Sequence, residues 1–190
     1  MESKIDVHAF LKIVSNEKCS PTLLPYYKNF IDELESVLQE KEEEIQTSKR
    51  QVPYNSIEIK FLEAQELELL RWKYFLRCYH EARMKKIQMI LGKMQRPNDE
   101  YMSLAERRYC DTIIPSMAAA FGSEFSPESF KPAPDDLSSF VFFEALDNIG
   151  DTLLSDSTTN QPLNITTGTF YFSRFQHVQP FVEEGKVMLV

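Results

Sequence analysis

The fold of this chain depends above all on SIEIKFLEAQELELLRWKYFLRCYHEARMKKIQMILGKM, residues 56–94. It contains no proline and a single glycine close to its end, so we expect one helix of roughly 55 to 60 Å. Apolar residues occur on more than one side of this helix, with Leu67, Leu70 and Tyr74 on one side and Trp72 beside them. A helix that is apolar over so wide an arc is buried by several neighbours or by another chain.

Three further segments of the first half have helical periodicity. Residues 6–17 place apolar side chains at helical spacing behind Asp6, a suitable N-cap, and residues 26–49 set an apolar stripe against an acidic, lysine-bearing face. A fourth helix is predicted over residues 103–121, because SLAE at its start is a capping-box pattern. Pro115 predicts a kink or a break inside it.

The composition changes after this helical part. GSEFSPESFKPAPDD, residues 122–136, is rich in Pro, Ser and acidic residues and is predicted to be a linker. The runs SSFVFFEAL, LNITTGTFYFSRF and KVMLV then favour strands. We therefore expect a mainly α protein: a helical bundle with one long helix over residues 1–121, the linker, and a small β-rich domain over residues 137–190. A domain of about 50 residues is marginal alone, so it is expected to lean on another part of the assembly.

Composition and motifs argue against several functional classes. The three cysteines are far apart, without a CxxC pair or a Cys/His cluster, and no GxGxxG or GxxxxGK[ST] loop occurs. The formal net charge of −8 opposes simple binding to a nucleic-acid backbone. No apolar stretch is long enough to span a membrane, and the first residues are not a signal peptide. We predict no catalytic residue, no metal ligand and no cofactor, and hence a protein that is not an enzyme.

Basic residues form stripes on the long predicted helix, and three interpretations compete. They neutralise this chain's own carboxylates, bind acidic residues of a partner, or contact nucleic acid; the negative net charge favours the first two. The residues are Arg71, Lys73, Arg77, Arg83, Lys85 and Lys86.

Four stretches together resemble one known family. They are NEKCSPTLLPY (residues 16–26), YFLRCYHEARMKKIQ (74–88), PAPDDLSSFVFFEAL (132–146) and PFVEEGKVMLV (180–190). In order and spacing they are similar to the Sld-five subunits of the eukaryotic GINS complex, a component of the replicative helicase. Tyr79, Arg83, Lys86 and Ile87 match the long-helix signature of that family. Glu81 and Gln88 depart from it, standing where the family tends to carry arginine and glutamate.

The resemblance implies a non-catalytic scaffold of the nucleus that serves DNA replication. The implied partners are three sister GINS subunits in a heterotetramer, together with the MCM hexamer and the Cdc-forty-five factor of the CMG helicase. Replicative polymerases and a replisome hub are additional implied partners. Contact with DNA is expected to be indirect or weak. The chain starts almost directly at its first predicted helix, so the acidic extension with which some relatives dock the hub is nearly absent.

The expected partner interface combines the long helix with the C-terminal residues. Its predicted members are Leu67, Leu70, Trp72, Tyr74, Tyr79, Arg83, Lys86, Ile87, Phe142, Phe181, Val187, Leu189 and Val190. In the final strand, Val187 and Leu189 are expected on one side and Met188 and Val190 on the other. One of these two sides is expected to cover the core of the β-rich domain and the other to meet a neighbour.

Three alternatives remain open at this point. The first is a Psf-one-type GINS subunit, which shares the order of helical and β-rich parts. The second is an unrelated helical adaptor, although repeated prolines interrupt any sustained heptad pattern. The third is a nucleic-acid-binding module that stacks bases on Phe170, Tyr171 and Phe172.

Overall fold

The computed structural model describes residues 6–53, 57–122, 126–134, 136–152 and 162–190. Four long helices come first: α1 (Val7–Cys19), α2 (Lys28–Gln51), α3 (Ile57–Gly92) and α4 (Leu104–Phe121). A β-rich part follows, with β3 (Phe140–Ala145), β4 (Gly150–Thr152), β5 (Leu163–Ile165), β6 (Phe170–Arg174) and β7 (Val187–Leu189), and with α5 (Phe175–Glu183) before the last strand. The predicted fold class, mainly α with a small β part, is confirmed.

The helix ends follow the local sequence. The carboxylate of Asp6 accepts a hydrogen bond from the amide of His8 at 2.9 Å and caps α1. At the start of α4, the Ser103 hydroxyl accepts from the Glu106 amide at 3.2 Å, and the Glu106 carboxylate accepts from the Ser103 amide at 2.7 Å, which is the predicted capping box. α4 continues through Pro115 instead of breaking there, with Ile114 before it and Met117 after it packed in the core against α3.

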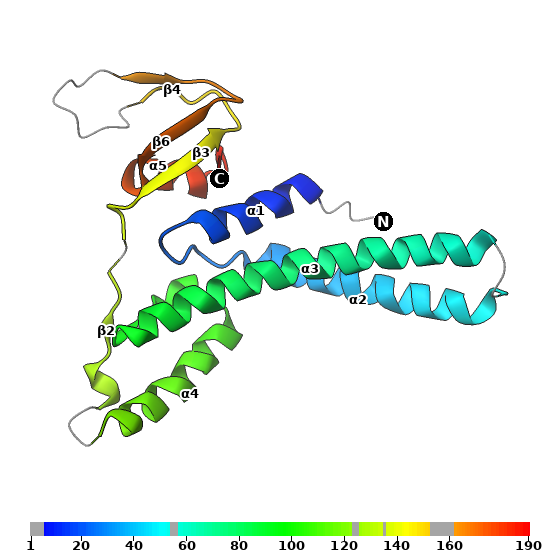
Figure 1. The fold of residues 1–190 in the computed structure, drawn as a ribbon, viewed down its shortest axis with the longest axis horizontal. Coiled ribbons are helices and arrows are strands. Elements are labelled where there is room, and N and C mark those ends of the chain that lie inside the picture. The colour runs from blue at the N-terminus through cyan, green and yellow to red at the C-terminus, as the bar shows by residue number, and fades with distance from the viewer. Residues whose placement is uncertain (1–5, 54–56, 123–125, 135, 153–161) are drawn as a thin grey trace.

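α2 and α3 form an antiparallel hairpin whose far end extends well beyond the rest of the molecule (Figure 1). α1 lies against one side of α3, between the hairpin and the β-rich part, and α4 lies beside the C-terminal part of α3. The apolar stripes of α1, α2 and α3 meet in one core around Phe10, Ile31 and Leu69. A second core, with Ile87, Leu91 and Ile114 among its members, joins α3 to α4.

Part of the predicted linker packs against the helices. Phe130 is buried in the core between α3 and α4. Next to it, β2 (Lys131–Pro132) pairs in parallel with β1 (Gln95–Arg96), which follows α3 directly. The chain between the helical and β-rich parts is therefore attached to the helices for some of its length.

The β-rich part is built on an antiparallel sheet with the strand order β6–β3–β7. Its inner face carries Val141 and Phe143 of β3 and is covered by Phe175, Val178 and Val182 of α5. The run LNITTGTFYFSRF, predicted as one strand-like stretch, is split into β5 and β6 by a turn in which Gly168 has a positive φ of 74°. β5 pairs with β4 in a separate two-stranded ribbon.

The final strand is held on both edges. β7 pairs with β3 on one side, and Val187 and Leu189 are fully buried in the inner core. On the other side, α1 supplies side-chain partners to the strand backbone. The Asn16 side-chain oxygen accepts from the Leu189 amide at 2.7 Å, and the Ser15 hydroxyl donates to the Leu189 carbonyl at 2.6 Å. The apolar C-terminus is thus tied to the first helix of the same chain, which closes an otherwise open sheet edge.

Candidate partner interface

A buried cluster of charges holds α1, α3 and α4 together. The Arg83 guanidinium on α3 donates to the Glu106 carboxylate of α4 at 2.7 and 3.1 Å and to the Glu17 carboxylate of α1 at 2.8 Å. Lys86, one helical turn later, donates to Glu17 at 2.8 Å. The side chains of Arg83 and Glu17 are only 0% and 1% exposed. Two cations thus face two carboxylates, so the cluster is neutral overall.

Backbone carbonyls and aromatic rings complete the surroundings of Arg83. Its remaining donors reach the carbonyls of Leu24 at 2.8 Å and Tyr101 at 2.6 Å. The rings of Tyr26 and Tyr79 lie 5.3 and 5.6 Å from its central carbon, within the range of cation–π attraction. A buried ion pair is tolerated only when its other hydrogen-bonding positions are also occupied, and this condition is met here.

The cluster shifts the titration of its members in ways that favour the ionised forms of Arg83 and Glu106. Burial lowers the pKa of Arg83, but the hydrogen bond that Arg83 donates to Glu106 and the charge of Glu17 outweigh it, so the pKa is raised. Burial raises the pKa of Glu106, but the Arg83 hydrogen bonds and charge, with the Ser103 donors, bring it below the ordinary glutamate range. For Lys86 burial dominates, and its pKa is lowered in spite of Glu17.

The first interpretation of the basic stripes therefore holds for several of their members. Arg83 and Lys86 neutralise carboxylates of this chain inside the molecule. Nearer the hairpin end, Lys73 pairs with Glu42 of α2 at 2.7 Å, and Arg71 pairs with Glu68 at 3.2 Å. Arg77 and Lys85 lie exposed on α3.

The other half of α3 exposes a broad apolar surface. α2 covers one side of it, with Leu69 buried in the shared core. The opposite side carries Leu67, Leu70 and Tyr74, which are 69%, 55% and 60% exposed, and Phe61 lies exposed nearer the hairpin end. We call Leu67, Leu70 and Tyr74 the exposed α3 face. Contiguous apolar surface of this kind marks interaction sites in soluble proteins.

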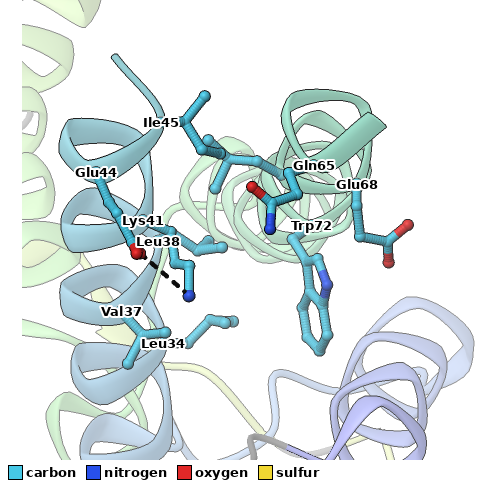
Figure 2. Close-up of a pocket in the computed structure, with 10 residues that line it drawn as sticks. Leu34, Val37, Leu38, Lys41, Glu44, Ile45, Gln65, Glu68 and Trp72 are labelled. Carbon is cyan, nitrogen blue, oxygen red and sulfur yellow. Dashed lines mark hydrogen bonds and ion pairs between the residues drawn. The ribbon is translucent and has the colours of Figure 1, made fainter. Parts of the chain in front are cut away.

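An apolar groove runs between the two hairpin helices next to this region (Figure 2). Leu34, Leu38 and Ile45 line it from α2, and Leu69 and Trp72 line it from α3. Lys41 bridges to Glu44 at 3.2 Å on its rim. Gln65 and Glu68 of α3 add polar side chains to its lining.

The structure places the predicted interface residues in three environments. Leu67, Leu70, Tyr74, Phe142 and Val190 are exposed. Trp72, Lys86 and Phe181 are partly buried. Tyr79, Arg83, Ile87, Val187 and Leu189 are buried inside the chain, where they support its own cores. Participation of any of these residues in a partner interface stays a prediction.

The structural roles of several residues could not be recognised from the sequence. Asn16, Glu17 and Glu106 act through partners far along the chain, which one sequence cannot pair. The capping-box position of Glu106 explained only its local role. The outward direction of Phe140, Phe170 and Phe172 could be obtained from strand alternation only once the inner face was known.

The described parts of the chain give no support to metal or membrane chemistry. Among the described residues, no group of three or more His, Cys, Asp and Glu side chains lies together in a way that could hold a metal ion. In the same parts of the chain, no helix combines the length and apolar character needed to cross a membrane.

Comparison with known proteins agrees with the resemblance seen in the sequence. The family model described as "DNA replication complex GINS protein SLD5 C-terminus" matches residues 135–190, which comprise the sheet, α5 and the final strand. The curated relative "DNA replication complex GINS protein SLD5" of Dictyostelium discoideum is 28% identical over 192 residues, covering 92% of this chain and 87% of the relative. The match therefore extends over the helical part as well as the β-rich part. Both comparisons thus relate the chain to the SLD5 proteins of the GINS complex.

Proposed function

We propose that the chain is a non-catalytic scaffold subunit of a GINS heterotetramer in DNA replication. In this role it joins three sister subunits, and the tetramer binds the MCM hexamer and the Cdc-forty-five factor to form the active helicase at replication forks. A nuclear location follows from the same proposal. The support is the similarity to SLD5 proteins together with one structural observation, the exposed α3 face.

The exposed α3 face supports assembly because exposed apolar side chains do not stabilise the fold of an isolated monomer. Leu67, Leu70 and Tyr74 expose more than half of their surface on a helix that is charged elsewhere. The groove beside Trp72 adds further apolar area. Obligate interfaces bury about 2,000 Å² or more and are largely apolar. Long helices that pack side by side on sister chains would supply that area.

The proposal is tested by co-expressing the chain with its three candidate sister subunits. We expect one stable species with one copy of each subunit on size-exclusion chromatography with light scattering. The double variant Leu67→Ser, Tyr74→Ser should prevent this species from forming. The matched variant Glu40→Ser, Glu43→Ser, on the exposed acidic face of α2, should leave it intact. A chain that stays a soluble, cooperatively melting monomer beside its candidate sisters would contradict the proposal.

A further inference from the structure

The outer face of the three-stranded sheet carries four exposed phenylalanines. Phe140 and Phe142 project from β3, and Phe170 and Phe172 project from β6, each between 55% and 62% exposed. We call these four residues the phenylalanine face. The rings of Phe140 and Phe172 stack at 5.1 Å, and those of Phe142 and Phe172 lie 4.5 Å apart. Phe140, Phe142 and Phe172 thus form one continuous aromatic surface, and Phe170 lies on the same face of β6, two residues before Phe172.

The sequence of β3 is that of a strand covered on both sides. Phe140, Val141, Phe142 and Phe143 are consecutive apolar residues, whereas a strand with one solvated face alternates apolar with polar residues. Val141 and Phe143 are buried under α5, so one side has its cover within the chain. Phe140 and Phe142 give the other side the same apolar character. We therefore expect a second layer of structure to cover this outer surface of the sheet.

The dimensions of the face fit a helix. The cross-strand pairs Phe140–Arg174, Phe142–Phe172 and Glu144–Phe170 form three rows along the strands. Three rows extend over about 14 Å. A helix of about nine residues has that length. The inner face gives a direct precedent: α5 has nine residues and covers the same strands with Phe175, Val178 and Val182.

The charges at the two ends of the face define the partner further. Arg174 lies at one end, with its guanidinium 5.4 Å from the centre of the Phe140 ring. Glu144 lies in the row at the opposite end, paired across the strands with Phe170. A complementary helix has an acidic side chain at the first end and a basic one at the second.

We propose that the phenylalanine face binds an amphipathic helix of another protein chain, which places an acidic residue beside Arg174 and a basic residue beside Glu144. Its apolar residues recur at the i, i+3 or i+4, and i+7 positions, as they do in α5. This goes beyond the assembly proposed above, which rests on α3. It requires only that one helix of some partner covers the sheet.

Single-stranded nucleic acid is the less favoured occupant of the same face. Exposed aromatic rings beside an arginine can stack on bases. However, residues 137–190 contain six acidic residues and two basic ones, and backbone phosphates require a basic groove. The local charge therefore favours a protein helix.

The proposal is tested first by site-specific crosslinking in the assembly purified from its own cells. Phe142 and, separately, Phe172 are replaced by the photoreactive residue benzoylphenylalanine in the full chain, with exposed Thr167 as the control position. We expect crosslinks from both test positions to residues three or four apart on one helix of another chain, and none to that helix from the control position. Crosslinks to nucleic acid, to a second copy of this chain or to alternate residues of a strand would overturn the proposal, and so would their absence.

A charge swap tests the orientation of the bound helix. Arg174→Glu should weaken binding of the crosslinked partner at least about tenfold, and an acid-to-lysine change in that partner should restore it. Lys93→Glu, at an exposed site at the end of α3, is the matched control and should have no effect. If Arg174→Glu binds as well as the unmodified chain, or is not rescued, the proposed orientation is wrong.

Paired phenylalanine variants separate binding from folding. Phe172→Ser on the outer face should leave the thermal melt unchanged and weaken binding of the crosslinked partner at least about tenfold. Phe143→Ser on the inner face should instead lower the melting temperature, since Phe143 is fully buried. Unchanged binding by Phe172→Ser would overturn the proposal. The assembly proposal fails by a different result, the failure to recover the three sister subunits.

Discussion

The two halves of α3 both carry apolar and charged side chains around most of their circumference, but their surroundings differ. Toward its C-terminal end, α1, α4 and the chain before α2 surround it, and even Arg83 finds all its partners inside the molecule. Its N-terminal part extends with α2 beyond the rest of the molecule (Figure 1), and Leu67 and Tyr74 are exposed there. Side-chain type alone therefore does not show which part of such a helix is left for contact with other chains. The number of elements of the same chain that pack around each part does show it.

The largest effect is expected from breaking the buried half. Arg83→Met removes the cation between Glu17 and Glu106 and leaves two buried carboxylates with too little positive charge. The free energy of unfolding should fall by about 3 to 5 kcal/mol. Arg77→Met, an exposed site on the same helix, should change it by less than about 0.5 kcal/mol. Chemical denaturation of both variants measures the difference, and equal stability would refute an organising role for the cluster.

The exposed half should give the opposite result. Leu67→Ser and Tyr74→Ser should each leave the free energy of unfolding within about 0.5 kcal/mol, since neither residue is buried in the chain. Each should weaken assembly with sister subunits by about 2 kcal/mol if it lies at the centre of an interface. Titration calorimetry or a competition assay measures the loss. A variant that melts early yet assembles normally would reverse the assignment of this half.

A smaller effect is expected where α1 joins the final strand. Asn16→Ala removes a buried acceptor for the Leu189 amide and a donor, at 3.4 Å, for the Val187 carbonyl. We expect a loss of about 1 to 2 kcal/mol, together with faster hydrogen exchange in β7. Lys18→Ala, at an exposed site of α1, is the control. Unchanged exchange in β7 would show that α1 does not hold the strand.

The smallest effect concerns pH. The folded-state pKa of Glu106 lies below its unfolded value, because the hydrogen bonds and charge of Arg83 and the Ser103 donors outweigh burial. Its contribution to stability is therefore fully present above the ordinary glutamate range and is lost as the pH falls through the lowered pKa. Glu106→Gln should lower stability at neutral pH and flatten its decline in acid. Parallel curves for both proteins would mean that Glu106 is not linked to the cluster.

The local features of the fold could be predicted from the sequence because they depend on neighbouring residues. The Asp6 cap, the Ser103–Glu106 box and the long helix through residues 57–92 depend on spacing within one or two turns. Strand alternation likewise placed Val187 and Leu189 on one side of the final strand, but only the structure shows that this side is the buried one. Pro115 is a counterexample, since packing on both sides of it lets α4 continue.

Long-range partners could not be predicted from one sequence. Arg83 and Lys86 carried a recognisable pattern, but three interpretations fitted it until Glu17 and Glu106 were located beside them. In the same way, one sequence could not show that α1 takes an edge of the final strand, and contact of this strand with a neighbour stays a prediction. Pairings of this kind depend on sequence separations of up to 174 residues.

Side-chain footprinting can show whether another chain covers the N-terminal half of α3. Hydroxyl radicals modify exposed aromatic and aliphatic side chains, so Leu67, Leu70 and Tyr74 should react readily in the isolated chain. In the assembled complex we predict strong protection of all three, while Ile87, already buried, reacts slowly in both states. Equal modification of the exposed α3 face in the two states would contradict the account.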